Sequence, residues 1–405
     1  MTGGRDATGT PPPARGWLLR LVVSFAFAQG AVSMARPAVS YHALELGADA
    51  GAVGAVTAVY ALLPLVVAVP LGRRTDRGRC APLLPVGVAL IAAGCGLSGT
   101  AHSLGALAAW SALLGLGHLV FVIGAQSLVA RQSGPAEHDR NFGQFTIGAS
   151  LGQFAGPLFA GWLVGGAGPQ GMTERSSALA LFGSGALAVC AYATLWRIEN
   201  RAGADAAHAD GGPAPGDDTV PVARILRARG VPAGIFTSLA VLSATDVLTA
   251  YLPVVGEERG IAPGMVGVLL SLRAGASVLS RVVLPPMTSR LGRQPLLVLS
   301  CLVAGGLCAV LALPVPVWVL GVALLLLGFC LGVGQPLTMS TVVQAAPDSA
   351  RSTALALRLT GNRLGQVAAP AGAGLLAGAA GAAAPFVLLG ALLVGASGTA
   401  ARSRP

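Results

Sequence analysis

The chain has 405 residues, of which 54% are hydrophobic and 10% are charged, and its formal net charge is +10. Soluble domains carry about 25% charged residues, so this composition excludes an ordinary soluble protein. The basic residues are dispersed between apolar runs, which argues against a nucleic-acid partner. The six cysteines show neither metal-ligand nor disulfide-framework spacing, and we expect no cofactor and no metal.

Apolar runs of about 20 residues, long enough to cross a bilayer as a helix, recur along the chain. Six spans are expected at residues 17–39, 51–71, 81–101, 104–127, 141–165 and 176–196. Six more are expected at residues 230–254, 263–284, 295–313, 316–339, 351–376 and 382–399. We therefore predict an all-α membrane protein of twelve transmembrane helices. Its parts are a tail (1–16), an N-terminal six-helix bundle (17–196), a solvated linker (197–222) and a C-terminal six-helix bundle (223–400).

The arginines predict the orientation of these spans. Most of those between the spans fall on the side of the two termini, whereas Arg175 and Arg259 are expected on the other side. Positively charged loops stay in the cytoplasm. We therefore expect both termini in the cytoplasm and a multi-pass protein of the plasma membrane.

A degraded internal repeat relates the two halves. The segment from Gly148 to Pro157 (GASLGQFAGP) returns from Gly361 to Pro370 (GNRLGQVAAP), 213 positions later. Duplicated membrane halves are typical of secondary transporters whose site lies between the halves. The repeat predicts two pseudo-symmetric bundles around a shared, alternately exposed cavity.

The basic segment from Gly72 to Arg79 (GRRTDRGR) lies between the second and third spans. It resembles the signature loop of the major facilitator superfamily, with one residue fewer after Arg77. A degenerate partner lies between spans 8 and 9, where Pro285 and Ser289 follow Gly72 and Asp76 by 213 positions. The resemblance implies a twelve-helix transporter fold and a cytoplasmic gate. The gate residues would be Gly72, Asp76, Arg77, Gly78, Arg79, Arg290, Gly292 and Arg293. An anchor that only sets orientation is the alternative interpretation.

Span 5 resembles the antiporter motif of the same superfamily, although Ala160 replaces its penultimate glycine. The matching residues are Gly143, Gly152, Gly156, Pro157 and Gly161. The resemblance implies a drug or metabolite exporter driven by proton antiport. One departure opposes this, because span 4 lacks the arginine that proton-coupled exporters of this family usually carry. Close packing of small residues is the simpler alternative.

Five charged residues are expected well inside the spans, away from their ends, namely Arg36, Asp246, Arg273, Arg358 and Arg363. An arginine that faces lipid at a helix centre costs about 2.5–3.5 kcal/mol, so each should face a cavity or a partner. Other polar residues share their helix faces. The predicted cavity lining is Gln29, Arg36, His118, Gln126, Asp246, Arg273, Arg358, Asn362, Arg363 and Gln366.

Asp246 has two interpretations: it carries a proton, or it pairs with an arginine such as Arg273. The surplus of arginines favours an anionic substrate, since guanidinium groups bind carboxylate or phosphate. Alternatively, Arg36 lies at the outer interface and Arg358 reaches toward the cytoplasm.

The expected function is secondary active transport of a small organic molecule by alternating access, with export by proton antiport. Uptake of an organic anion by proton symport or exchange is the alternative. The expected partners are the solute, protons and the bilayer, and we expect a monomer. The sequence contains neither a zinc-protease H-E-x-x-H motif nor a phosphate-binding P-loop, so an enzyme is not expected. The duplicated halves favour alternating access over a channel.

Overall fold

The computed structural model describes residues 16–77, 82–133, 138–165, 174–195, 222–228, 230–345 and 351–402, and the regular structure within them is helical. The first half contains α1 (Trp17–Glu45), α2 (Ala50–Arg77), α3 (Leu83–Gly99), α4 (Leu104–Gln132), α5 (His138–Gly165), α6 (Glu174–Cys190) and the short α7 (Tyr192–Leu195). The second half contains the short α9 (Val222–Arg227), then α10 (Val231–Glu258), α11 (Pro263–Leu291), α12 (Arg293–Ala312), α13 (Val317–Ala345), α14 (Arg351–Ala380) and α15 (Ala384–Arg402).

Each predicted span corresponds to one long helix, so the prediction of an all-α membrane protein is confirmed. Within the described residues, ten helices are long and apolar enough to cross a membrane. The other two are α3, with 17 residues, and α14, which carries Arg351, Arg358 and Arg363. These two helices are therefore recognised as spans by their places in the duplicated bundles. The predicted linker lies almost entirely outside the described residues.

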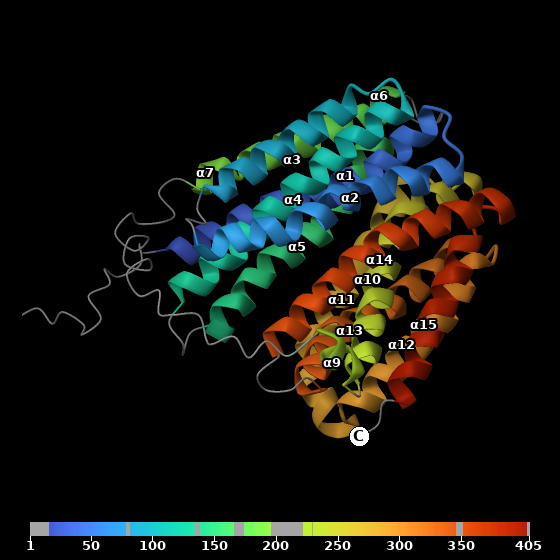
Figure 1. The fold of residues 1–405 in the computed structure, drawn as a ribbon. Coiled ribbons are helices and arrows are strands. Elements are labelled where there is room, and N and C mark those ends of the chain that lie inside the picture. Colours follow the sequence, from blue (N-terminus) through green and yellow to red (C-terminus); the bar gives the residue numbers. More distant parts are fainter. Residues whose placement is uncertain are drawn as a thin grey trace, which may run out of the picture.

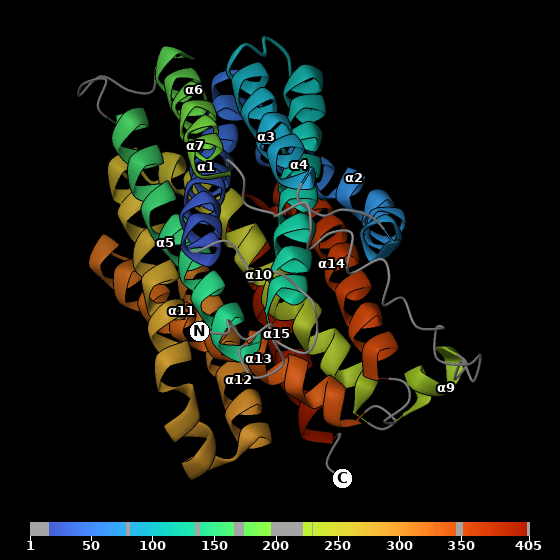
Figure 2. The ribbon, with the colours of Figure 1, turned by 90° about the vertical axis from the view of Figure 1, so that its left-hand side faces the viewer.

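The long helices form two bundles, α1–α6 and α10–α15 (Figures 1 and 2). The bundles approach each other at one end and diverge at the other, where α1 begins and α15 ends (Figure 1). We call these the closed end and the open end.

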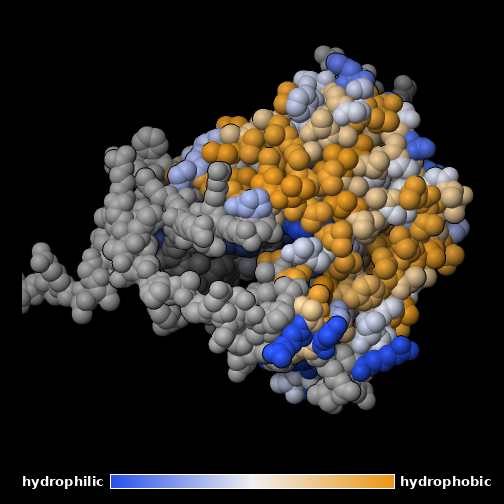
Figure 3. All heavy atoms as spheres, viewed as in Figure 1, coloured by the Kyte–Doolittle hydropathy of each residue, from blue (hydrophilic) through white to orange (hydrophobic). Residues whose placement is uncertain are grey.

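Burial separates a lipid-facing surface from an interior. Large apolar side chains cover much of the outside, as Figure 3 shows; Trp162, Val282 and Leu375 are 69%, 71% and 79% exposed. In contrast, 83% of the most apolar stretch of α10 and 61% of that of α1 is buried inside the protein. Polar side chains on these two helices therefore lie within the protein rather than against lipid.

The two segments that resemble the superfamily's signature loop are not loops over most of their length. Helix α2 continues through Arg77 and α11 through Leu291, so that the helical positions include Gly72, Asp76 and Arg290. Gly292 has a φ of 77° and precedes Arg293, the first residue of α12. Gly78 and Arg79 lie outside the described residues. Hydropathy locates the part of a helix inside the membrane, and charged turns can extend that helix into water, so the loop prediction was wrong here.

The 213-residue repeat corresponds to repeated contacts in three dimensions. A Cβ on Gly115 of α4 would collide with the backbone oxygen of Tyr60 of α2. A Cβ on Gly328 of α13 would collide with the backbone oxygen of Arg273 of α11. Both members of the second pair follow those of the first by 213 positions. The duplication therefore preserved the close approach of these helices in each bundle.

The closed end is formed by two glycine contacts between the bundles, which we call the glycine seams. In one, a Cβ on Gly54 of α2 would lie 2.6 Å from the Cα of Gly374 of α14. In the other, a Cβ on Gly267 of α11 would lie 3.0 Å from the Cα of Gly161 of α5. The two seams are equivalent under the 213-residue offset, with the bundles exchanged. Only a residue without a side chain allows backbones to approach so closely.

We expect Gly374→Val to open the closed end, because its Cβ would lie 2.7 Å from the backbone oxygen of Gly51. Gly378→Val is the matched control on the same helix, since a Cβ there meets nothing within 4 Å. Spin labels placed on α2 and α14 at this end should report a longer inter-bundle distance in the first variant only. Equal distances in both variants would show that the seam does not require glycine.

Candidate functional site

An ion pair joins the two bundles near the middle of their innermost helices. Arg36 Nη1 of α1 donates to Asp246 Oδ1 of α10 at 2.5 Å. Gln366 Nε2 of α14 donates to Asp246 Oδ2 at 2.9 Å. The Asp246 side chain is 6% exposed and that of Arg36 is 18% exposed. Both carboxylate oxygens are therefore occupied by donors, one from each bundle.

A neutral network extends from this ion pair into the first bundle. The Arg36 guanidinium lies 5.3 Å from the ring centre of Tyr60, within cation–π range. The Tyr60 hydroxyl lies 2.9 Å from His118 Nδ1, and His118 Nε2 lies 3.1 Å from Gln29 Oε1. Gln29 Nε2 in turn donates to Ser33 Oγ at 3.2 Å. These distances fit a neutral His118 that accepts from Tyr60 and donates to Gln29.

The second bundle contributes further cations. Arg363 Nη1 donates to Gln366 Oε1 at 2.9 Å, so Gln366 connects Arg363 to Asp246. Arg273 is 8% exposed and lies close enough to Arg36 and Asp246 to interact with both charges. The centre of the protein thus brings three arginines near one carboxylate. We call Arg36, Asp246, Arg273, Arg363 and Gln366 the central cluster.

The structure brings together most, but not all, of the residues predicted to line the cavity. Asp246 pairs with Arg36 rather than with Arg273, and Arg36 lies at the centre rather than at the outer interface, because α1 and α10 cross there. Arg358 is directed elsewhere, donating to the Gln335 side chain at 3.2 Å and to Thr338 at 3.4 Å.

The two remaining predicted polar residues lie along α14 and α4. Asn362 is buried, and its Oδ1 atom has no partner among the described residues. Gln126 is exposed, two helical turns from His118. Sequence reasoning missed Tyr60, although the repeat offered a signal, since Tyr60 precedes Arg273 by 213 positions.

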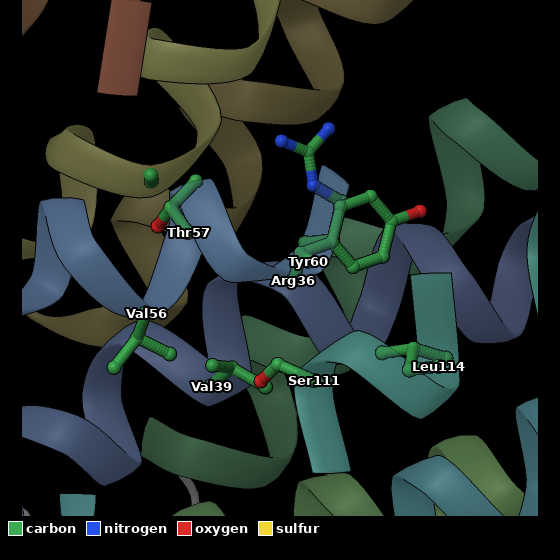
Figure 4. Close-up of a pocket in the computed structure, with 8 residues that line it drawn as sticks. Arg36, Val39, Val56, Thr57, Tyr60, Ser111 and Leu114 are labelled. Atoms are coloured by element: carbon green, nitrogen blue, oxygen red, sulfur yellow. The ribbon is translucent and has the colours of Figure 1, made fainter. Parts of the chain in front are cut away.

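A small cavity lies between the ion pair and the closed end (Figure 4). It is lined by Arg36, Val39, Val56, Thr57, Tyr60, Ser111, Leu114 and Ala250. Figure 4 shows the Arg36 guanidinium beside the Tyr60 ring. The volume of about 20 Å³ is sufficient for about one water molecule. This cavity is therefore too small to hold an organic solute.

The antiporter-type motif of α5 contacts both bundles. A Cβ on Gly152 would lie 2.5 Å from the backbone nitrogen of Gly30 of α1, and a Cβ on Gly156 would lie 2.7 Å from the Gly30 oxygen. Pro157 and Gly161 instead contact α11 at a glycine seam. The packing of Gly143 lies outside what the structure describes. One face of the motif thus holds α5 against its own bundle, and its last turn contacts the other bundle.

A second cavity, of about 420 Å³, opens between α5 and α11. Its lining is mainly apolar and includes Ile147, Leu151, Phe154 and Val282, with Arg281 among them. The four apolar side chains are also exposed on the outside of the protein. This cavity is therefore a lateral groove between the bundles, distinct from the central cluster.

We expect Asp246→Asn to lower the stability by about 3–5 kcal/mol, because it leaves Arg36 buried without its anion. Thermal unfolding in detergent measures this, with Glu258→Gln at the exposed end of the same helix as control. The double variant Arg36→Gln, Asp246→Asn should recover most of the loss, since no unpaired charge of the pair remains. An unfolding temperature unchanged in Asp246→Asn would show that the pair does not hold the bundles together.

Comparisons with known proteins agree with this architecture. A single-residue mutant of a nucleoside transporter, NupG, superimposes with a TM-score of 0.76 at 13% identity, over 96% of this chain and 100% of that chain. A bacterial homologue of the human lysosomal transporter Spinster, in an inward-facing and occupied conformation, gives a TM-score of 0.75 at 14% identity, covering 96% and 97% of the two chains. A POT family transporter in complex with 5-aminolevulinic acid gives 0.74 at 14% identity, covering 97% and 96%.

At these identities the three structures show a shared fold. No curated protein matches the chain. The family model of the Major Facilitator Superfamily matches residues 21–317 and 234–402, which together include both bundles. The duplicated sequence, the paired bundles and this match lead to one conclusion: the chain belongs to the Major Facilitator Superfamily.

Proposed function

We propose that this membrane transporter moves a small organic molecule by alternating access and exports it in exchange for protons. The observation that carries the proposal is the pair of equivalent glycine seams at the closed end, combined with an inter-bundle ion pair at the centre. Bundles that rock about a central site would separate at the seams and approach each other at the present open end. A solute at the central cluster would then face alternate sides of the membrane.

The arginine distribution supports cytoplasmic termini, which makes the open end the cytoplasmic one. The conformation described above is then inward-facing. In that conformation the glycine seams of the closed end would separate the central cluster from the outside. Gradient-driven transport requires such a conformation, in which one side is sealed while the other is accessible.

Asp246 supports a role for protons. It is the acid that lies at the centre of the described helices, and it bridges both bundles through Arg36 and Gln366. Protonation would remove the carboxylate charge and weaken the contact with Arg36, which would allow the bundles to move apart at this point. Solute binding and proton binding would in this way compete for the same arginine-rich centre. The antiporter-type motif at the seam of α5 supports the export direction.

Uptake of an organic anion by proton symport or exchange remains the second candidate. The observation that favours it is the excess of arginine over carboxylate in the central cluster. The direction of transport does not follow from this excess, because an anion can be exported as well as imported.

The test uses purified protein in liposomes under an imposed pH gradient, with a panel of organic anions, cations and neutral compounds. Export by antiport predicts saturable flux of some compound against the direction of proton flow, and collapse of the pH gradient when that compound is added. Asp246→Asn should abolish both signals, whereas Glu258→Gln should retain them. Flux that rises without saturation would indicate a channel, and flux with the proton flow would indicate symport.

A further inference from the structure

We propose that Arg273 is the primary anchor for an oxyanion group, a carboxylate or phosphate, of the transported solute. This inference rests on the proposed transport function and names the chemical class of its substrate. Arg273 lies on α11, in the bundle opposite to Arg36, and is 8% exposed. Unlike Arg36, Arg358 and Arg363, it has no hydrogen-bond acceptor for its guanidinium among the residues that the structure describes.

Three other arginines within the spans each have an acceptor, whereas Arg281 is exposed and lines the lateral groove. Arg36 binds Asp246, Arg358 binds Gln335 and Thr338, and Arg363 binds Gln366. The Arg273 guanidinium has no acceptor among the described residues, and its Nε atom, like that of Arg358, is buried without a partner. A cation in this position is costly unless an anion joins it, so the site is incomplete as it stands.

Arg273 lies in the central cluster rather than against lipid. Arg273 interacts electrostatically with Arg36 and with Asp246. Its equivalent in the repeat is Tyr60, whose side chain contacts Arg36 from the first bundle. The backbone of each of these two residues is held by an equivalent glycine, Gly115 or Gly328, from a neighbouring helix. Tyr60 and Arg273 therefore occupy corresponding positions in the two bundles.

Asp246 is engaged by other donors and makes no hydrogen bond with Arg273 in the described structure. One of its oxygens is bound to Arg36 and the other to Gln366. Arg36 and Arg273 also repel each other as like charges. Arg363 adds a further positive charge near Asp246. The described central cluster thus contains three cations and one anion. One additional oxyanion would bring its charge closer to neutrality.

The chemistry of arginine selects the class of ligand. Its planar guanidinium presents parallel N–H donors that match the two oxygens of a carboxylate or phosphate. A neutral solute would leave the Arg273 charge uncompensated, and a cationic solute would be repelled. We therefore infer that the oxyanion of the solute binds Arg273, while the Tyr60, His118 and Gln29 network lies on the opposite wall.

The first test requires no knowledge of the solute. If Arg273 serves a ligand rather than the fold, Arg273→Gln should unfold in detergent at the same temperature as the wild type or higher. Arg224→Gln, at an exposed position of α9, is the matched control. A fall in unfolding temperature as large as that of Asp246→Asn would overturn the proposal, because Arg273 would then stabilise the protein itself.

The second test measures ligand binding by thermal stabilisation with a panel of small monocarboxylates, dicarboxylates and phosphate monoesters. Each acid is paired with its neutral amide or parent alcohol. Some acids should raise the unfolding temperature of the wild type, whereas their neutral partners should not. Arg273→Gln should weaken this binding at least 10-fold, and Arg273→Lys should retain part of it.

Stabilisation by neutral or cationic members only, or equal stabilisation of Arg273→Gln by the acids, would contradict the proposal. Failure of the transport proposal would look different. In that case the acids would bind and depend on Arg273, but liposomes would show no gradient-driven flux of the same acids. This outcome would support the oxyanion site while rejecting transport.

Discussion

The ion pair between Arg36 and Asp246 is the interaction on which the arrangement of the two bundles depends. It connects α1 and α10, the most buried helices of the two halves, at a depth where a lone charge of either sign would be costly. Burial makes the pair expensive to break, yet its energy comes from charge and can be changed by a proton or an anion. The same contact can therefore hold the bundles together and allow them to part.

Gene duplication explains the scaffold but not the charges. The glycine seams and the contacts of Gly115 and Gly328 are equivalent in the two halves. The charged residues have lost this equivalence, because Asp246 corresponds to Ser33 and Arg36 to Thr249. Backbone packing was retained in both copies, since any added side chain would separate the helices. The polar interior diverged, which allowed one half to supply the carboxylate and the other its partner.

The two bundles contribute different groups to the centre of the protein: neutral polar side chains from the first and arginines from the second. The first bundle presents a neutral network in which Tyr60, His118 and Gln29 satisfy one another. The second bundle presents Arg273 and Arg363, the former without a described acceptor. A solute held between them would meet hydrogen-bonding groups on one side and positive charge on the other. Such an asymmetric site can orient a molecule that has one anionic end.

The membrane class, the twelve helices, the duplication and most members of the central cluster could be predicted from the amino-acid sequence. These features depend on local hydropathy, on repeat spacing and on the cost of charge in a membrane, all of which act through chain position alone. The pairing of Asp246 with Arg36 instead of Arg273, and of Arg358 with Gln335, could not be predicted and is seen only in the folded protein. Helix crossing decides such pairings, because residues 210 positions apart meet through the packing of α1 against α10.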